Sequence, residues 1–198
     1  RTLLLAAPLA AFGWSVSLAV TVGGHGFTSP LTTPFEYLAG VQAVDGAASF
    51  LRSFTSQLPT FPTHIKGHPP GLVMVLWVMD RVGLGAPVFA SILVVAVGAS
   101  GVAAVLLTVR WVCGEQVARR AAPFLVLSPA AVWMATSGDA FFTGVGAWAV
   151  AATVLVHLGR RLPLAIDEGQ QVQDLVPRQT IEQALGHDRD LRVFGLNV

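Results

Sequence analysis

Long stretches without a single charged residue constrain this chain more than any other feature. Leu3–Val22, Pro87–Val109 and Ala140–Leu158 contain no Asp, Glu, Lys or Arg. A helix needs about 20 apolar residues to cross the hydrocarbon core of a bilayer. Ala121–Gly138 is a fourth such run, and it includes Pro129, which a span tolerates although it bends the helix. The sequence therefore predicts an all-α, polytopic membrane protein with four spans, at about 3–22, 87–109, 121–138 and 140–158.

The composition agrees with a bilayer environment for most of the chain. Charged residues make up 12% of the sequence, about half of their share in soluble domains. Residues 1–161 carry nine basic and five acidic side chains, whereas residues 162–198 carry three basic and six acidic ones. The chain thus divides into an apolar body and a polar tail. The single cysteine, Cys113, excludes an internal disulfide framework, and no basic patch indicates a nucleic-acid partner.

The basic residues predict the orientation of the four spans. Lys and Arg accumulate in the cytoplasmic connections of membrane proteins. With four spans, Arg1, the connection from Arg110 to Arg120, and the pair Arg160-Arg161 all fall on one side, which is then cytoplasmic. Residues 23–86 form an extracytoplasmic loop of a multi-pass protein of the cell membrane. Leu3–Val22 also fits a signal peptide, although its apolar run is longer than the usual 7–15 residues.

The external loop, residues 23–86, is expected to contain a helix along the membrane surface. Thr33-Pro34-Phe35-Glu36 reads as a helix start, with Thr33 as the cap and Glu36 closing a capping box. Over residues 34–54 the apolar and polar residues occupy opposite faces at helical spacing. The apolar face is Leu38, Val41, Val44, Ala48, Leu51 and Phe54. A helix with two such faces beside a membrane is typical of an interfacial helix.

The densest polar cluster of the chain follows in the same loop. His64, Lys66 and His68 lie within five residues, directly before Pro69-Pro70. The apolar segment that follows ends at Asp80-Arg81 and is too short to span, so we expect a short surface helix over residues 69–81. Two histidines and a lysine next to a helix start suit a phosphate or pyrophosphate group. The two histidines could also ligate a metal, but alternate spacing in a loop is weak support, and no metal site is predicted.

These residues together resemble a known family. An acidic residue in the first external loop (Glu36), an interfacial helix, and His68-Pro69-Pro70 opening a short helix resemble the GT-C membrane glycosyltransferases. The closest types are protein O-mannosyltransferases and the aminoarabinose transferases of lipid A. Asp139, after the third predicted span, matches a further acidic residue of the family on the same side. The resemblance covers about residues 1–161. Family members often have an acidic pair where this chain has Glu36 alone, and they have more spans, so the chain resembles their N-terminal part.

The resemblance implies a function and roles for individual residues. It implies transfer of a sugar from a polyprenyl-phosphate donor to an acceptor on the outer face of the membrane, with a membrane portion beyond this chain. Glu36 would accept the proton of the acceptor hydroxyl or position a divalent metal that assists, although no cofactor is assigned. His64, Lys66 and His68 would hold the lipid phosphate, and Asp139 would support the catalytic site. The sugar and the acceptor stay unidentified.

Structural explanations stand beside these roles. In these explanations Glu36 has no role beyond that of a helix cap, and Lys66 is an interfacial anchor that reaches the headgroups. Asp139 is then part of a tight external turn. The competing function is a non-catalytic membrane protein, either half of a transporter or an assembly subunit. A transporter would place ionisable residues near the middle of its spans, whereas here they gather in an external loop. The tail, residues 162–198, is expected to be polar, cytoplasmic and either disordered or frameshifted. Its abrupt change in composition fits a frameshifted or prematurely ended reading frame as well as it fits a genuine domain.

Overall fold

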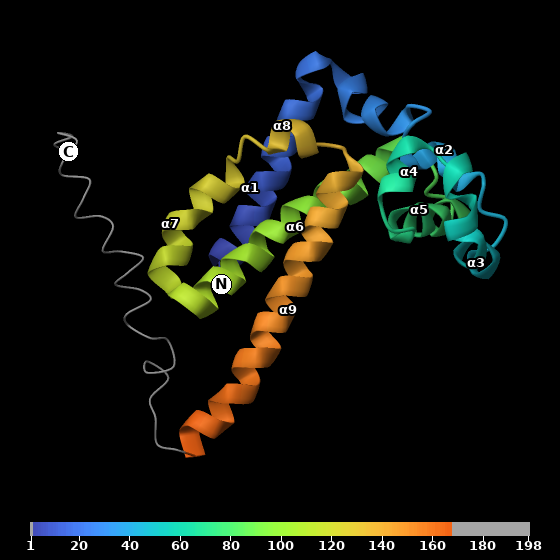
Figure 1. Cartoon of the computed structure of the whole chain (residues 1–198). Helices are drawn as coiled ribbons and strands as arrows, with labels where there is room; N and C mark the ends of the chain where they lie inside the picture. Colours follow the sequence, from blue (N-terminus) through green and yellow to red (C-terminus); the bar gives the residue numbers. More distant parts are fainter. Residues whose placement is uncertain (1, 168–198) are drawn as a thin grey trace, which may run out of the picture.

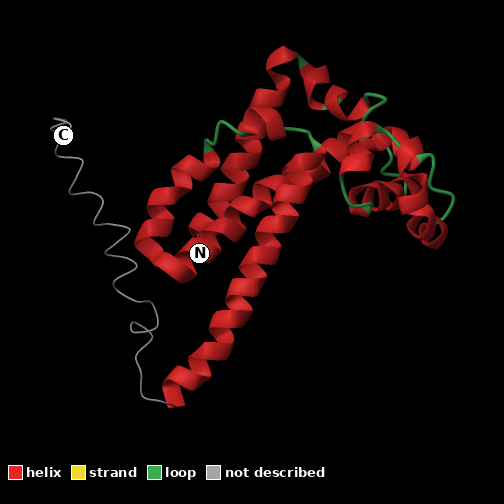
Figure 2. Cartoon of the chain, in the orientation of Figure 1, coloured by secondary structure: helices red, strands yellow, loops and turns green. Residues whose placement is uncertain are grey.

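The computed structural model describes residues 2–167, and within that range the chain is entirely helices joined by turns, with no strand (Figures 1 and 2). The all-helical prediction is therefore confirmed. Three long helices, α1 (Thr2–Ala19), α6 (Pro87–Cys113) and α9 (Gly138–Asp167), form one part of the molecule. The short helices of the predicted external loop gather at one end of this part, where α6 and α9 begin (Figure 1).

Three helices have the length and composition to cross a membrane. They comprise residues 2–22, where α1 continues into the 3₁₀ turn η1 (Val20–Val22), then α6, and then residues 138–157 of α9. Mean hydropathy is highest in α6, at 2.6 over its most apolar window. These helices correspond to the predicted spans 3–22, 87–109 and 140–158. Since many of their apolar side chains are exposed, the surface of the bundle suits a hydrocarbon environment.

The helices α6 and α9 pack in parallel through small residues. Gly98 faces Ala140, and Gly101 faces Gly144, so the sequence numbers increase in the same direction along both helices. Further along the pair, Trp148 Nε1 donates a hydrogen bond to Ser100 Oγ at 3.0 Å. Glycine lets the two backbones approach closely, as in many membrane helix pairs. Because α6 and α9 run in the same direction, the chain between them must return across the length of the bundle.

This returning segment corrects the prediction of a helical span at 121–138. It consists of α7 (Glu115–Val126), a turn, and the single-turn helix α8 (Ala131–Met134), and α7 lies alongside α1 and α6. The break has a local cause. Pro129 has no N–H to continue the helix, and its ring disfavours helical geometry at Ser128. The sequence predicts a tolerated kink at Pro129, whereas in the structure the helix α7 ends before it.

Residues 23–86, the predicted external loop, fold into a small helical layer on the first turns of α6. It contains α2 (Tyr37–Val41), α3 (Ala47–Gln57), α4 (Thr63–Gly67) and α5 (Gly71–Arg81), with the 3₁₀ turns η2 (Gly24–Phe27), η3 (Ser29–Thr32) and η4 (Leu58–Thr60). Its buried core is shared with α6. The core residues are Leu31, Tyr37, Val44, Phe50, Phe61, Ile65, Leu72, Val73, Leu76, Ala90, Val94 and Val95.

The helix predicted over residues 34–54 is two helices, α2 and α3, separated at residues 42–46. The break places Gly46 in an extended conformation directly before α3. It also rotates the second helix, so Phe50 is buried while Leu51, part of the predicted apolar face, is 51% exposed. Gly40 permits α2 to lie against Ile65 of α4, because a side chain at residue 40 would collide with that isoleucine. The short helix expected over residues 69–81 is observed as α5.

The end of the apolar body differs from the predicted boundary at residue 161. The helix α9 continues as far as Asp167, six residues into the segment assigned to the polar tail. The remainder of that segment, residues 168–198, lies outside the described residues.

Candidate active site

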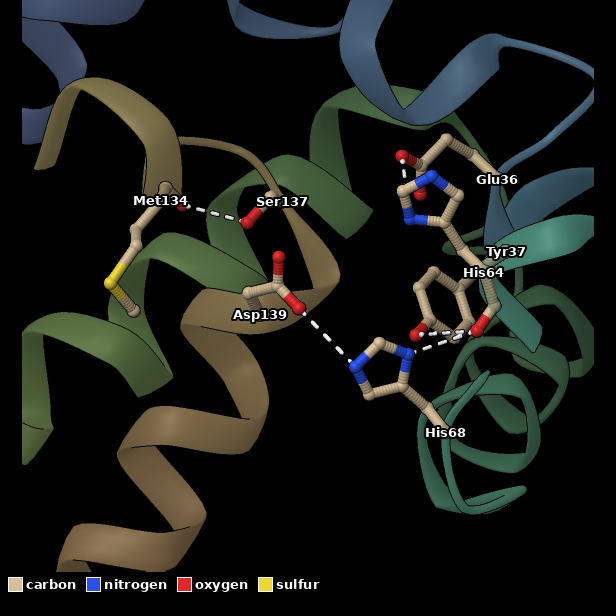
Figure 3. A network of polar contacts seen from close by, with 7 residues as sticks. All are labelled: Glu36, Tyr37, His64, His68, Met134, Ser137 and Asp139. Carbon is tan, nitrogen blue, oxygen red and sulfur yellow. Dashed lines mark hydrogen bonds and ion pairs between the residues drawn. The ribbon is translucent and has the colours of Figure 1, made fainter. Parts of the chain in front are cut away.

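Four of the predicted site residues come together where the external loop meets the start of α9 (Figure 3). Glu36 precedes α2, His64 lies in α4, His68 follows α4, and Asp139 is in the first turn of α9. They form two histidine–carboxylate pairs. His64 Nδ1 lies 3.4 Å from Glu36 Oε1, and His68 Nε2 lies 3.3 Å from Asp139 Oδ1. Residues 103 positions apart in the sequence thus share one network.

Glu36 is the most buried member of this network. The residue is 8% exposed, and it occupies the position before α2 in an extended conformation. The predicted capping box is absent: Thr33 makes no side-chain cap, and its carbonyl accepts a hydrogen bond from the Glu36 N–H instead. One carboxylate oxygen, Oε1, faces His64. The other, Oε2, is buried and has no hydrogen-bond partner within the described chain. Glu36 therefore has a lone-pair-bearing oxygen left free for a donor.

The surroundings of Glu36 favour its protonated form. Burial is the largest cause, and it raises the pKa of the carboxyl above its ordinary value because a charged group loses its hydration. The nearby Asp139 carboxylate raises that pKa further, while His64, the Tyr37 N–H and His68 oppose the shift. A carboxyl group with a raised pKa is better suited to exchange a proton near neutral pH than an ordinary surface glutamate.

The second pair places both ring nitrogens of His68 next to oxygen atoms. His68 Nδ1 lies 3.0 Å from the backbone carbonyl of His64, and a carbonyl can only accept, so Nδ1 is the donor. The other ring nitrogen, Nε2, faces the Asp139 carboxylate, and the two form an ion pair in the protonated form of the imidazole. Asp139 remains 60% exposed, so this pair is open to solvent on the side of the aspartate.

Tyr37 links the two pairs. It is not among the site residues predicted from the sequence. Its ring is fully buried, and its hydroxyl donates to the same His64 carbonyl at 3.2 Å. Burial first, and then the charges of Glu36 and Asp139, raise the pKa of Tyr37, so the phenol keeps its proton and remains a donor. A signal was available, because this is the only tyrosine in the chain and it adjoins Glu36.

Aromatic packing holds the loop against α9. The His68 ring stacks on Phe142, with centroids 4.8 Å apart and planes 8° from parallel. Gly138 lies directly against the ring of Tyr37, and any side chain at residue 138 would collide with it. The loop core and the first turn of α9 therefore meet through Tyr37, His68 and Phe142, and this contact sets the position of Asp139.

The connection that leads into α9 contains a strained residue. Thr136 is buried and has a φ of 58°, in the left-handed region that a β-branched residue rarely adopts. Such a conformation costs on the order of 1–3 kcal/mol and is found preferentially at functional sites. Thr136 lies three residues before Asp139, so this turn directs the first turn of α9 toward the loop.

Lys66 lies outside this network. It is exposed on α4, between His64 and His68, and makes no ion pair with the side chains of residues 2–157. The structure therefore separates the predicted phosphate-binding set. The two histidines contact carboxylates, and the lysine is free to meet a ligand.

The donor set does not form a site of the zinc type. Within the described part of the chain, no three His, Cys, Asp or Glu side chains are arranged to hold a metal ion. The four titratable side chains form two separate pairs, whereas a zinc site directs at least three protein ligands to one point.

Comparisons with known proteins give no family for the chain. No protein-family model, no curated protein sequence and no solved structure matches it. Its function must therefore be inferred from the geometry of the site.

Proposed function

We propose that this chain is the N-terminal part of a GT-C-like membrane glycosyltransferase, which transfers a sugar from a polyprenyl-phosphate donor to an acceptor on the outer face of the membrane. The observation that carries the proposal is that two carboxylates from distant parts of the sequence, Glu36 and Asp139, each pair with a histidine in one small region. This region lies where the apolar helices α6 and α9 begin. A donor with a prenyl tail needs this placement, because its tail stays in the bilayer while its phosphate lies at the boundary.

In this proposal Glu36 is the general base. The Glu36 carboxylate accepts the proton of the acceptor hydroxyl, whose oxygen then forms a bond to the anomeric carbon of the sugar. The bond from that carbon to the phosphate oxygen breaks, and the polyprenyl phosphate leaves with the electron pair. His64 orients the Glu36 carboxylate through Oε1. Asp139 fixes His68 beside the reacting groups, so its role is to position.

Lys66 is the proposed phosphate ligand. A free ammonium group binds a phosphate as a point charge, and Lys66 has no competing ion pair among the described residues. His68 lies beside Asp139 (Figure 3), and its protonated form adds a positive charge to the site. Stabilisation of the phosphate charge as the sugar leaves is the main contribution expected from such groups.

The proposed topology has four crossings and places residues 23–86 outside the cytoplasmic membrane. The parallel arrangement of α6 and α9 supports this, because the segment 114–137 has to bring the chain back to the side where α9 begins. The crossing is then a broken one, made by α7, α8 and the turns around them. Arg110, Arg119 and Glu115 form ion pairs at the opposite end of α6, on the side proposed as cytoplasmic.

Binding of polyprenyl phosphate to the purified chain tests this proposal. We expect the phosphate to bind more tightly than the corresponding polyprenol, and Lys66→Gln to weaken its binding about tenfold, because charge-assisted contacts contribute roughly 1.5–3 kcal/mol. Arg52→Gln is the matched control, since Arg52 is an exposed basic residue of α3 in the same loop. Equal binding of phosphate and alcohol would instead favour the non-catalytic alternative, half of a transporter or an assembly subunit.

A further inference from the structure

A cavity lies in the loop layer, away from the histidine–carboxylate network. Its volume is about 750 Å³, within the range of small-molecule sites. Its walls come from α2, α5, the turn η3 and the first turn of α6. The polar lining residues are Thr32, Gln42, Asp45, Asp80 and Arg81, and the apolar ones include Leu38, Val41, Leu76, Trp77, Leu84, Pro87 and Ala90.

The cavity and the candidate active site lie toward opposite ends of α5. The helix α5 begins next to His68 and ends at Asp80 and Arg81, which line the cavity. With a rise of 1.5 Å per residue, its two ends are roughly 15 Å apart. The cavity is therefore a separate site, and a ligand there would not contact Glu36 or Asp139.

The charged groups of the cavity suit a ligand that carries one positive and one negative charge. The carboxylates of Asp45 and Asp80 line it and have no ion-pair partner within the described residues. Gly85 leaves space for Asp80, because a side chain at residue 85 would collide with the Asp80 carboxylate. The guanidinium of Arg81 lies over the Trp77 ring, 5.0 Å from its centroid. The cavity thus holds two free carboxylates and one cation placed on an aromatic face.

The position of the cavity points to a lipid as the source of that ligand. Pro87 and Ala90 belong to the first turn of α6, the most apolar of the candidate spans. On the same turns of α6, Val88, Phe89 and Ile92 are about 40% exposed. A lipid with its headgroup in the cavity could therefore lay its acyl chains along α6, where they would cover this apolar surface.

We propose that the cavity binds the headgroup of a zwitterionic phospholipid with a primary ammonium group, that is, a phosphoethanolamine headgroup. Asp45 and Asp80 receive the ammonium N–H groups, and Arg81 binds the phosphate. The face of Trp77 holds the Arg81 guanidinium in position for the phosphate. This inference does not depend on the glycosyltransferase proposal, because the two sites share no residue.

The test uses the full chain in detergent and a short-chain phosphatidylethanolamine as the probe, with binding followed by tryptophan fluorescence. We expect the ethanolamine lipid to bind at least about fivefold more tightly than a phosphatidylglycerol of the same chain length, which lacks the ammonium group. The fluorescence change should be absent in Trp77→Phe. Asp45→Asn with Asp80→Asn should remove the preference between the two lipids.

Glu115→Gln is the matched control for the loss of a carboxylate, since Glu115 lies beyond the far end of α6. It should leave the preference intact. Equal binding of the two lipids to the unmodified chain would overturn the proposal without the use of any variant. Selective binding that survives in the Asp45 and Asp80 variants would also overturn it, because the ammonium group would then be recognised elsewhere.

Discussion

Replacing Glu36 with glutamine is expected to lower sugar transfer by about 10²–10⁴-fold, the usual contribution of a general base. Glutamine has nearly the same shape, but its amide cannot accept the hydroxyl proton. Binding of polyprenyl phosphate should be unchanged, because Glu36 is not proposed to contact the phosphate. The measurement is transfer from a polyprenyl-phosphate sugar in membranes that contain the full-length protein, with Glu115→Gln as the control for carboxylate loss. Full transfer activity in Glu36→Gln would exclude Glu36 as the base.

Glu36→Gln is expected to lower activity but to raise the stability of the folded protein. Burial raises the pKa of Glu36 in the folded protein. Protonation of this carboxyl therefore stabilises the folded state relative to the unfolded one. That contribution is present below the pKa of the unfolded chain and is lost as the pH rises through the raised, folded value. Glutamine does not ionise. Glu36→Gln should therefore be more stable than the unmodified protein at pH 8, and the difference should shrink toward pH 4 in thermal unfolding measurements.

Gly144→Val is expected to disrupt the packing of α9 against α6. A side chain at residue 144 would collide with the Val97 carbonyl oxygen. Forcing extra atoms into a packed interface costs about 1–3 kcal/mol. Gly146 is the matched control, because a side chain there meets no atom within 4 Å. Gly144→Val should lower the apparent melting temperature in detergent clearly more than Gly146→Val does. Similar melting temperatures for the two variants would contradict the parallel packing of the two helices.

The displacement caused by Gly144→Val should also reach the candidate site. Asp139 lies on the turn of α9 that precedes this crossing, and it faces His68 at 3.3 Å. When α9 moves away from α6, the loop loses its contact with Asp139. Sugar transfer should therefore fall in Gly144→Val and stay close to the unmodified level in Gly146→Val.

The fold was predictable from the sequence wherever composition alone decides it. Leu3–Val22, Pro87–Val109 and Ala140–Leu158 have no charge, and a long apolar run has few alternatives to a helix. The segment 121–138 was not predictable in this way, because composition does not distinguish a kinked helix from one that ends before Pro129. The close approach of α2 to α4, where Gly40 lies against Ile65, is a tertiary contact that a periodic pattern does not contain.

The candidate site was predictable as a set of residues but not as an arrangement. Glu36, His64, His68 and Asp139 stand out as ionisable groups in an apolar chain. Their pairing follows from the docking of the loop on α9, through the Tyr37 and Phe142 rings. Lys66 was grouped with the two histidines because of its spacing. Residues two apart lie on different faces of a helix, so Lys66 does not share the contact that His64 of α4 makes with Glu36.

The most direct test of the proposed outer-face site is the sidedness of its two halves. Gly67→Cys in the loop and Ser137→Cys before α9 are each introduced with Cys113→Ser, and intact cells are treated with a membrane-impermeant thiol reagent. We expect both introduced cysteines to react from outside, whereas the native Cys113, exposed at the opposite end of α6, should react only after the cells are opened. If Gly67→Cys and Ser137→Cys react from opposite sides, Glu36 and Asp139 cannot share a site, and the proposed function is wrong.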